Sequence, residues 1–323
     1  MDVLLMIERW IEPLSRSRWI EPLSALAIIL ITRQVQFKVA QLLIIFTPRN
    51  SLLRQASIPI QVALGALAFP SIQHAIVDPI SIHYRVLAGG TIVLQTLVSI
   101  ATSAMIRFDD KDASALSKTP GLWNKMGALT DLMNSQQCIG TPYQISWIAP
   151  FDENRPEYIP PRGEIIRSRA TAIVGGYFFR QIWIALFWQR LHFGFFWLIY
   201  MNSWLNSLYV FGDLVSALLG GAVEDRPPAF GPIRYSNTIR GWWGKFWHQS
   251  HGYPLQGAAT YICKDVLGLK SLPQRYANIL IVFALSGIFH IFTDRAEGIG
   301  YEQSKAMVFF CAQPVGILIE DAA

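Results

Sequence analysis

Two histidines are candidate catalytic residues because each lies in a setting that is unusual for an ionisable side chain. His290 lies deep in the apolar segment 279–290. An ionisable group at such depth is costly and marks a functional site by default, and desolvation favours the neutral imidazole that accepts a proton. On a helix, Ser286 and Gly287 share its face, and Asp294 follows one turn later, near enough to orient the ring. The pattern predicts a general base. The alternative is a histidine that hydrogen-bonds a neighbouring helix.

The second candidate, His248, lies near the end of a tryptophan-rich segment, residues 236–249. If the segment is one helix, Gly241, Gly244, His248 and His251 fall near one face by their spacing. The two glycines would then let a ligand or a backbone approach His248, while the indoles anchor the helix at the membrane interface. The alternative, equally supported by residue chemistry alone, is an interfacial amphipathic helix whose histidine contacts lipid headgroups.

Basic residues precede His248 in a stretch with few acids, and they are candidates for binding an acidic cosubstrate. They are Arg234, Arg240 and Lys245. The planar fork of arginine suits phosphate oxygens, so these side chains would hold the phosphates of coenzyme A. The alternative is contact with anionic lipid on the cytoplasmic side.

Three acids, Asp109, Asp110 and Asp112, follow an uncharged apolar segment. Metal-bound diphosphate chemistry needs such carboxylates at a membrane rim, whereas a solvated helix end is the more common explanation. The three cysteines are far apart and make no zinc spacing. We therefore expect no metal and no tightly bound cofactor.

The elements that must position these residues are membrane helices. The chain has 323 residues, of which 52% are hydrophobic and only 15% charged, against roughly 25% charged in soluble domains. A span needs about 20 apolar residues, and seven segments are candidates. Four are strong (58–77, 86–106, 192–212 and 276–293), and three are short or interrupted by charge (22–46, 170–189 and 306–319).

These patterns predict an all-α polytopic membrane protein with about seven membrane helices and additional amphipathic interfacial helices. We expect one membrane-embedded domain over 1–323. Residues 1–21 would form an interfacial N-terminal segment, near which the seven residues 9–15 recur at 18–24. Residues 107–169 and 213–274 would be polar loops with amphipathic helices. The net charge is +5 without a long basic run, which suits cytoplasmic loops and a lipid bilayer and argues against nucleic acid as a partner.

At its histidine motifs the chain resembles the wax-synthase-like branch of the membrane-bound O-acyltransferases. The motifs are Phe-Trp-His-Gln at 246–249 and Ser-Gly-x-x-His at 286–290. Residues 138–144 also resemble a Gly-x-Gly-x-Pro-aromatic signature of fungal members, with Cys138 where glycine is usual and Gln137 where arginine is usual. The resemblance covers roughly residues 40–320, and relatives usually continue through at least one more apolar segment.

The resemblance implies transfer of an acyl group from acyl-CoA, in the fungal type acetyl from acetyl-CoA, to a hydroxyl of a lipophilic terpenoid or polyketide-derived secondary metabolite. His290 would remove the alcohol proton, and His248 would orient the thioester or stabilise the oxyanion. The supporting residues would be Trp247, Gln249, Ser286, Gly287, Asn237 and Asp294. We expect a multi-pass protein of the endoplasmic reticulum that needs no obligate protein partner.

Two alternatives keep the membrane fold but change the function. One is a terpenoid cyclase, isomerase or prenyl-handling enzyme, which the three aspartates would serve if it is metal-dependent. The other is an inactive homologue or a transporter. Esterification of an alcohol by labelled acetyl-CoA separates the acyltransferase from both.

Overall fold

The computed structural model of the chain describes residues 16–74, 82–117, 120–135, 137–188, 190–249 and 251–322. These residues form helices joined by turns and irregular loops, and no strand occurs among them. Most of the expected interfacial segment 1–21 lies outside the described residues. The all-α fold expected from composition is confirmed.

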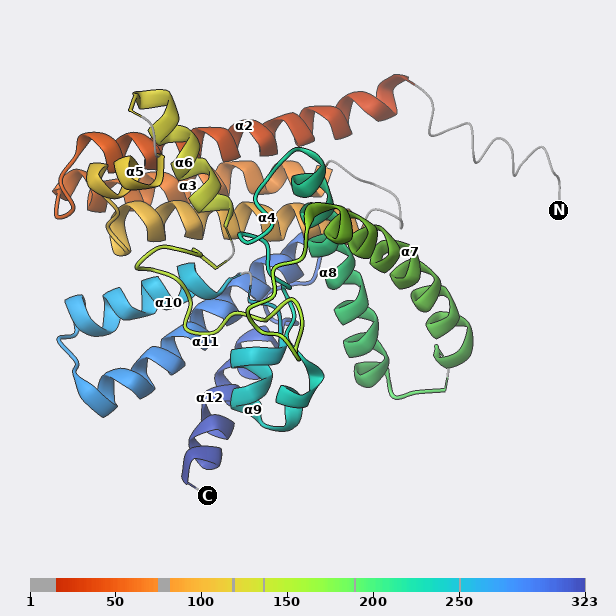
Figure 1. Cartoon of the computed structure of the whole chain (residues 1–323). Coiled ribbons are helices and arrows are strands. Elements are labelled where there is room, and N and C mark those ends of the chain that lie inside the picture. The colour runs from red at the N-terminus through yellow and green to blue at the C-terminus, as the bar shows by residue number, and fades with distance from the viewer. Residues whose placement is uncertain are drawn as a thin grey trace. The chain divides into compact units, whose positions relative to one another are not determined.

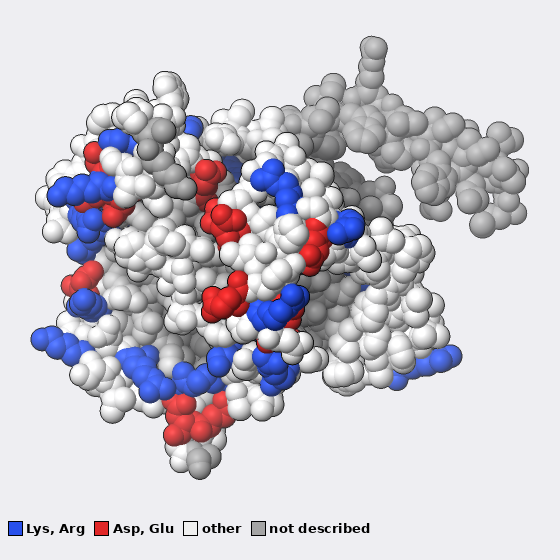
Figure 2. Space-filling view, in the orientation of Figure 1, with Lys and Arg blue, Asp and Glu red and all other residues white. Residues whose placement is uncertain are grey.

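Five helical segments are long and apolar enough to cross a bilayer: Ala27–Phe46, Leu52–Phe69, Val86–Met105, Arg162–Phe187 and Ser271–Ala296. Each corresponds to one of the seven segments expected from the sequence. Many of their large side chains are exposed, among them Leu67 and Phe178, and uncharged surface extends between separate groups of charges in Figure 2. Such faces suit lipid contact, since apolar surface of this extent is rare on soluble proteins.

The two other expected spans are helical but fall short of these five. Helix α8 (Phe193–Leu218) is long enough, yet Asn202, Asn206 and its many indole and phenol groups lower its hydropathy. Helix α12 (Ala306–Ala322) has 17 residues, fewer than the roughly 20 that a perpendicular span needs.

The chain divides into two compact units, one formed by residues 1–136 with 251–323 and the other by residues 137–250. In the first unit, α2 (Arg16–Phe46), α3 (Leu52–His74) and α4 (Ile82–Ile100) pack on one another. Helix α11 (Ser271–Ala296) packs on α4 and pairs with α12. Figure 1 labels these helices.

The first unit contains several shorter elements. They are the π-helix η3 (Ala101–Met105), α5 (Asp110–Ser117), α6 (Leu122–Asn134), α10 (Gly252–Thr260) and the π-helix η6 (Tyr261–Val266). The expected polar loop 107–169 therefore begins with two helices. It ends early, because α7 (Arg162–Phe187) begins eight residues before the expected span at 170.

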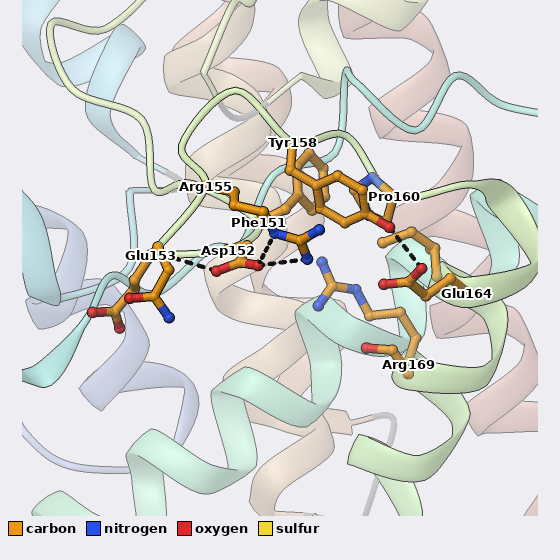
Figure 3. Close-up of a pocket in the computed structure, with 11 residues that line it drawn as sticks. Phe151, Asp152, Glu153, Arg155, Tyr158, Pro160, Glu164 and Arg169 are labelled. Carbon is orange, nitrogen blue, oxygen red and sulfur yellow. Dashed lines mark hydrogen bonds and ion pairs between the residues drawn. The ribbon is translucent and has the colours of Figure 1, made fainter.

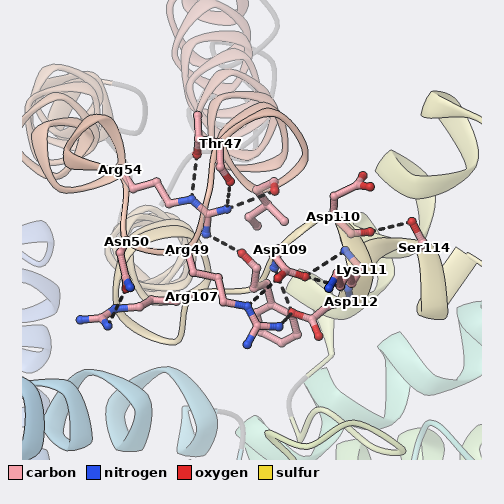
Figure 4. A network of polar contacts seen from close by, with 12 residues as sticks. Thr47, Arg49, Asn50, Arg54, Arg107, Asp109, Asp110, Lys111, Asp112 and Ser114 are labelled. Carbon is pink, nitrogen blue, oxygen red and sulfur yellow. Dashed lines mark hydrogen bonds and ion pairs between the residues drawn. The ribbon is translucent and has the colours of Figure 1, made fainter.

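A buried arginine joins the polar ends of three elements in the first unit. Arg54, near the start of α3, is 1% exposed. Its guanidinium donates to the backbone oxygens of Ile44 at 3.1 Å and Thr47 at 2.6 Å, and also to those of Ser103 and Phe108. These carbonyls belong to or follow the last turns of α2 and η3, where intrahelical partners are missing (Figure 4). Arg54 thus provides donors to the carbonyls at both helix ends.

Two of the charges that interrupt the apolar spans have polar partners from neighbouring helices. Arg33 of α2 donates to Gln95 Oε1 at 3.3 Å and to Asn134 Oδ1 at 2.6 Å. Arg180 of α7 donates to the hydroxyl of Ser207 on α8 at 2.7 Å. Such pairing lets a charged residue remain in an apolar helix.

The second unit is built on the hairpin of α7 and α8, which pack side by side. Arg169 of α7 and Asp213 of α8 form an ion pair at 3.4 Å, and Arg180 and Ser207 meet farther along. After α8 come a 3-10 turn, η4 (Ile233–Asn237), the short α9 (Ile239–Gly241) and the π-helix η5 (Trp242–Phe246).

Candidate active site

His290 lies on α11 in the first unit, and the backbone of its own helix holds its ring. The ring Nδ1 is 2.8 Å from the carbonyl oxygen of Ser286, one turn earlier. A carbonyl only accepts, so this contact assigns the proton to Nδ1 and leaves the lone pair of Nε2 available. The ring of Phe310 on α12 packs against the imidazole with centroids 4.3 Å apart. The arrangement suits a base that faces an apolar substrate.

The orienting partner of His290 differs from the expectation. Asp294 was expected to orient the ring, but its carboxylate accepts a hydrogen bond from Ser304 Oγ at 2.6 Å. Ser286 supplies the contact instead, and it does so through its carbonyl oxygen. A backbone oxygen one turn back is always within reach on a helix, whereas the Asp294 side chain is drawn to the loop before α12.

Gly287 permits the close approach of α12 to α11. A Cβ at this position would lie 3.1 Å from Met307 Sδ and 3.3 Å from Met307 Cα, closer than side chains normally pack. The absence of that carbon lets α12 bring Phe310 onto the ring of His290. Gly287 therefore acts through helix packing.

A second histidine lies in the same unit beside this site. His251 immediately precedes α10, and its ring packs on that of Phe289 with centroids 4.8 Å apart. The spacing in the sequence predicts His251 on one helical face with His248 and does not predict this contact beside His290. Nothing in the spacing along the chain indicates it, because the contact joins residues 38 positions apart in different helices.

The expected single helix around His248 is wrong. Helix α9 passes into η5, and the helical path ends at Phe246, because Trp247 is extended with φ −67° and ψ 152°. The Gln249 side chain donates to the backbone oxygens of Trp243 at 3.2 Å and Trp247 at 2.6 Å, and Gly231 N donates to Phe246 O. These contacts satisfy the carbonyls that end the helix, and His248 follows in irregular backbone.

Of the two glycines near His248, only Gly241 is required by a close backbone contact. A Cβ at Gly241 would lie 2.2 Å from the carbonyl oxygen of Tyr235, while at Gly244 no atom lies within 4 Å. Gly241 is thus required for the close approach of η4 to the following turn. Neither glycine shares a helical face with His248.

His248 lies in an aromatic cluster of the second unit. Its Nδ1 is 3.4 Å from the hydroxyl of Tyr209 on α8. The rings of Phe230 and Trp247 lie 5.7 Å and 5.3 Å from its ring. Tyr209 was not anticipated from the sequence, because its contact depends on how α8 packs on the segment after residue 220. With the phenol donating to Nδ1, the Nε2–H of neutral His248 is left to donate one hydrogen bond to a developing oxyanion.

The remaining supporting residues have different surroundings. Trp247 stacks on Trp242 with centroids 5.6 Å apart. Gln249 is buried, and its side chain donates the two hydrogen bonds to backbone oxygens at the end of η5 that are described above. Asn237 ends η4 and is exposed.

The structure brings two of the three predicted coenzyme-binding cations together on one aromatic ring. Arg234 lies 5.1 Å and Lys245 4.7 Å from the ring centroid of Tyr235. Arg234 also pairs with Glu153 at 2.5 Å, so part of its charge is neutralised. Arg240 lies in α9, between them in sequence.

A polar cavity of about 470 Å³ lies in the second unit, where the loop after residue 150 meets the start of α7 (Figure 3). Several of its charged side chains have polar partners. Arg155 binds Asp152 at 2.8 Å, and the Tyr158 hydroxyl donates to Glu164 at 2.7 Å. The cavity was not anticipated, because its lining combines a loop and a helix.

The acidic cluster is occupied by basic side chains. Asp109 and Asp112 both pair with Arg49, at 2.6 Å and 3.0 Å (Figure 4). Asp110 pairs with Lys125 at 2.6 Å. The hydrogen bond from Arg49 is the largest cause that lowers the pKa of Asp109 to about 2. Asp109 also caps α5 by accepting from the backbone N–H of Asp112 at 3.1 Å. These carboxylates therefore cap the start of α5 and form ion pairs with Arg49 and Lys125.

Comparisons with known proteins bear on the segment that carries both histidines. Residues 226–312 match the model of the membrane bound O-acyl transferase family. The predicted resemblance to this family of membrane proteins is thereby confirmed for the stretch that contains His248 and His290.

The chain is also similar to curated fungal acetyltransferases. It is 36% identical over 130 residues to the acetyltransferase spyB of Aspergillus fumigatus, which is 39% of this chain and 22% of that protein. It is 41% identical over 128 residues to the acetyltransferase pyr8 of the same fungus, covering 39% of this chain and 30% of the relative. For the acetyltransferase ataH of Aspergillus terreus the identity is 44% over 99 residues, with 30% and 33% covered. The matches thus span a third or less of these relatives. No solved structure matches the chain significantly.

Proposed function

We propose that this chain is an acetyltransferase of the endoplasmic reticulum membrane that moves acetyl from acetyl-CoA to a hydroxyl of a lipophilic terpenoid or polyketide-derived metabolite. The observation that carries the proposal is the ring of His290, set in an apolar helix with Nδ1 bound to the Ser286 carbonyl. The family match over 226–312 and the acetyltransferase relatives support the reaction class.

In the proposed reaction, Nε2 of His290 takes the proton of the substrate hydroxyl as its oxygen attacks the thioester carbon. The C–O bond forms and the carbonyl oxygen becomes an oxyanion. Collapse of this intermediate breaks the C–S bond, and the coenzyme thiolate takes the proton back from His290. Acid–base assistance of this kind contributes about 10²–10⁴-fold. No covalent acyl-enzyme is needed.

His248 keeps the role predicted from the sequence, to orient the thioester or stabilise the oxyanion. Its contact with the Tyr209 hydroxyl supports this role, because fixed donors stabilise charge that develops in the transition state. Arg240, Lys245 and Arg234 are proposed to hold the phosphates of the coenzyme.

The test is a direct assay of ester formation. The chain is expressed in yeast microsomes, which are supplied with labelled acetyl-CoA and a panel of terpenoid and polyketide-derived alcohols. We expect a labelled ester with at least one alcohol and none without the chain. If isomerised or cyclised product forms without label, the terpenoid cyclase or isomerase replaces this proposal. If no product forms from any alcohol, an inactive homologue or a transporter is favoured.

A further inference from the structure

A cavity of about 330 Å³ lies between α11 and α12 in the first unit. Its walls are almost entirely apolar, and its lining includes Tyr276, Ala277 and Leu280 of α11 and Pro314, Ile317 and Leu318 of α12. Pro314 lies inside α12, and a proline inside a helix removes a backbone hydrogen bond and kinks the helix. A kink at this point lets α12 pack closely on α11 near Gly287 and leave space farther along.

Tightly packed residues separate the cavity from His290. The histidine follows Leu280 by ten positions on the same helix, which is about 15 Å along its axis. Between them, a Cβ at Gly287 would lie 3.3 Å from Met307 Cα, and Phe283 is only 7% exposed. An alcohol held in the cavity would therefore not reach the proposed base, so the cavity suits a different ligand.

The cavity lies at the depth of the acyl chains of one leaflet. Helix α11 has 26 residues and is apolar enough to cross a bilayer. Its length of about 39 Å exceeds the hydrocarbon core of about 30 Å, so its first turn reaches the headgroup region. Tyr276 and Leu280 lie about 8 Å and about 14 Å beyond the first residue of the helix. A hydrocarbon chain that enters from this leaflet can therefore occupy the cavity.

Polar side chains lie at the headgroup end of the cavity. Arg275 Nη2 is 3.5 Å and the Tyr276 hydroxyl 3.2 Å from Asp321 Oδ2, near the end of α12. The Arg275 side chain is still 53% exposed. Lys270 directly precedes α11, and its exposed side chain makes no hydrogen bond or ion pair in the part of the chain that the structure describes. Two cations are thus available near the level of lipid phosphates, and the acid beside them is already engaged.

We propose that this cavity binds a phospholipid, with an acyl chain between α11 and α12 and the phosphate on Arg275 and Lys270. Hydrocarbon suits the walls, because an empty apolar space forfeits van der Waals contacts. The fork of arginine matches phosphate oxygens, and lysine adds a second positive charge. This binding site goes beyond the proposed acetyl transfer and does not depend on it.

Photo-crosslinking of the full chain tests where the lipid lies. The detergent-solubilised protein is mixed with phosphatidic acid that carries a diazirine on one acyl chain, irradiated and digested, and the cross-linked peptides are identified by mass spectrometry. We expect cross-links concentrated on residues 276–280 and 314–318. Cross-links no more frequent there than on the exposed face of α7 overturn the proposal, because they would show only a surrounding lipid layer.

A cavity-filling substitution tests the site of the acyl chain. Ala277→Leu extends a lining side chain into the cavity, and it should lower cross-linking to residues 314–318 by about fivefold or more. Ala172→Leu is the matched control, since Ala172 is exposed on α7 in the other unit, and it should leave this cross-linking unchanged. Equal cross-linking in Ala277→Leu and wild type, with equal Tm, contradicts the proposal.

A double substitution tests the phosphate. One basic residue near lipid phosphates contributes about fivefold in binding, so Arg275→Gln with Lys270→Gln should raise the Kd for the phosphatidic acid probe about 25-fold. Arg190→Gln with Lys305→Gln removes two exposed charges elsewhere and should leave it within twofold.

Two further probes distinguish a phospholipid from the lipophilic substrate. Diacylglycerol with the same diazirine, which lacks the phosphate, should bind wild type about as weakly as phosphatidic acid binds Arg275→Gln with Lys270→Gln. If a terpenoid alcohol displaces phosphatidic acid and the double variant binds it like wild type, the cavity holds substrate and the proposal is wrong. These measurements need no ester formation, so their outcome is independent of the acetyltransferase assay.

Discussion

The rings of His290 and His248 are held in position in different ways. His290 lies on one uninterrupted helix of 26 residues, and its ring is held by a carbonyl of that helix. His248 lies in irregular backbone after a π-helix, and its ring contacts groups from separate segments, Tyr209 on α8 and Phe230 in the following loop. The first ring is placed by local geometry and the second by long-range packing. The position of the His248 ring should therefore depend on residues far away in the sequence, whereas the position of the His290 ring should depend mainly on its own helix.

The largest expected effect is the loss of His290. His290→Ala should lower kcat by about 10²–10⁴-fold, because it removes the general base, while expression and membrane insertion stay intact. The measurement is ester formation in microsomes with equal amounts of protein on blots. Ser286→Ala is the matched control, since it removes the hydroxyl and keeps the carbonyl that binds the ring. His290→Ala activity within about threefold of wild type would remove this residue from the mechanism.

The second prediction concerns substitutions in the aromatic cluster around His248. His248→Ala should lower kcat strongly, by about 10²-fold or more if it stabilises the oxyanion, with a smaller change in KM for the alcohol. Tyr209→Phe, which removes only the hydroxyl at 3.4 Å from Nδ1, should lower kcat by about two- to tenfold. Steady-state kinetics on both substrates measure these effects. A change in membrane affinity alone, with kcat preserved, would instead support the headgroup-binding alternative.

The sequence predicted the His290 region well because its signal is local. An apolar run of helical length sets α11, and the spacing from Ser286 to His290 places them one turn apart. Five of the seven expected spans proved long and apolar enough for a bilayer. The sequence did not predict the partner of Asp294, whose carboxylate accepts a hydrogen bond from Ser304 across a loop. Periodicity carries no information about such a partner.

The sequence predicted the His248 region poorly because a π-helix breaks the period. The extra residue in η5 and the extended Trp247 move everything after Phe246 off the helical register. The pinning contacts of Gln249 and Gly231 are side-chain and loop interactions that no spacing rule contains. His251 was assigned to the wrong neighbour for the same reason.

One departure from the family pattern carries a cost in backbone conformation. Cys138, at a position where glycine is usual in the resembling family, has φ +50°. A left-handed backbone costs a residue with a Cβ roughly 1–2 kcal/mol, and glycine avoids that cost. Burial raises the pKa of the Cys138 thiol to about 12. The cysteine is therefore a packed side chain in a turn that glycine would adopt without strain.

The third prediction concerns the cations near Tyr235. Arg240→Gln with Lys245→Gln should raise KM for acetyl-CoA about tenfold or more, because each charge-assisted hydrogen bond contributes roughly 1.5–3 kcal/mol. KM for the alcohol should barely move. Arg234→Gln should have a smaller effect, because Glu153 already pairs with Arg234. The kinetics are measured in detergent, where no anionic lipid competes.

The matched control for the third prediction removes two charges elsewhere. Arg190→Gln with Lys305→Gln changes the net charge equally at exposed positions outside the cluster. If both double variants leave KM for acetyl-CoA unchanged, the basic residues near Tyr235 contact lipid. If both raise it equally, the effect is one of net charge.

The smallest effect on catalysis is expected in the acidic cluster, where the acyltransferase and the metal-dependent alternative disagree. Changing Asp109, Asp110 and Asp112 together to Asn should leave kcat and both KM values within about threefold of wild type, and EDTA should do little. The carboxylates pair with Arg49 and Lys125, so their loss should instead lower Tm at pH 7.

The folded-state pKa of Asp109 is about 2, below the unfolded value of about 3.9. A lowered pKa stabilises the fold above the unfolded value and loses that contribution as pH falls toward the folded one. The Tm difference between wild type and the triple variant should therefore narrow as pH falls from 5 toward 3. Loss of activity in the triple variant, with wild-type activity removed by EDTA and restored by Mg²⁺, would favour diphosphate chemistry at this cluster.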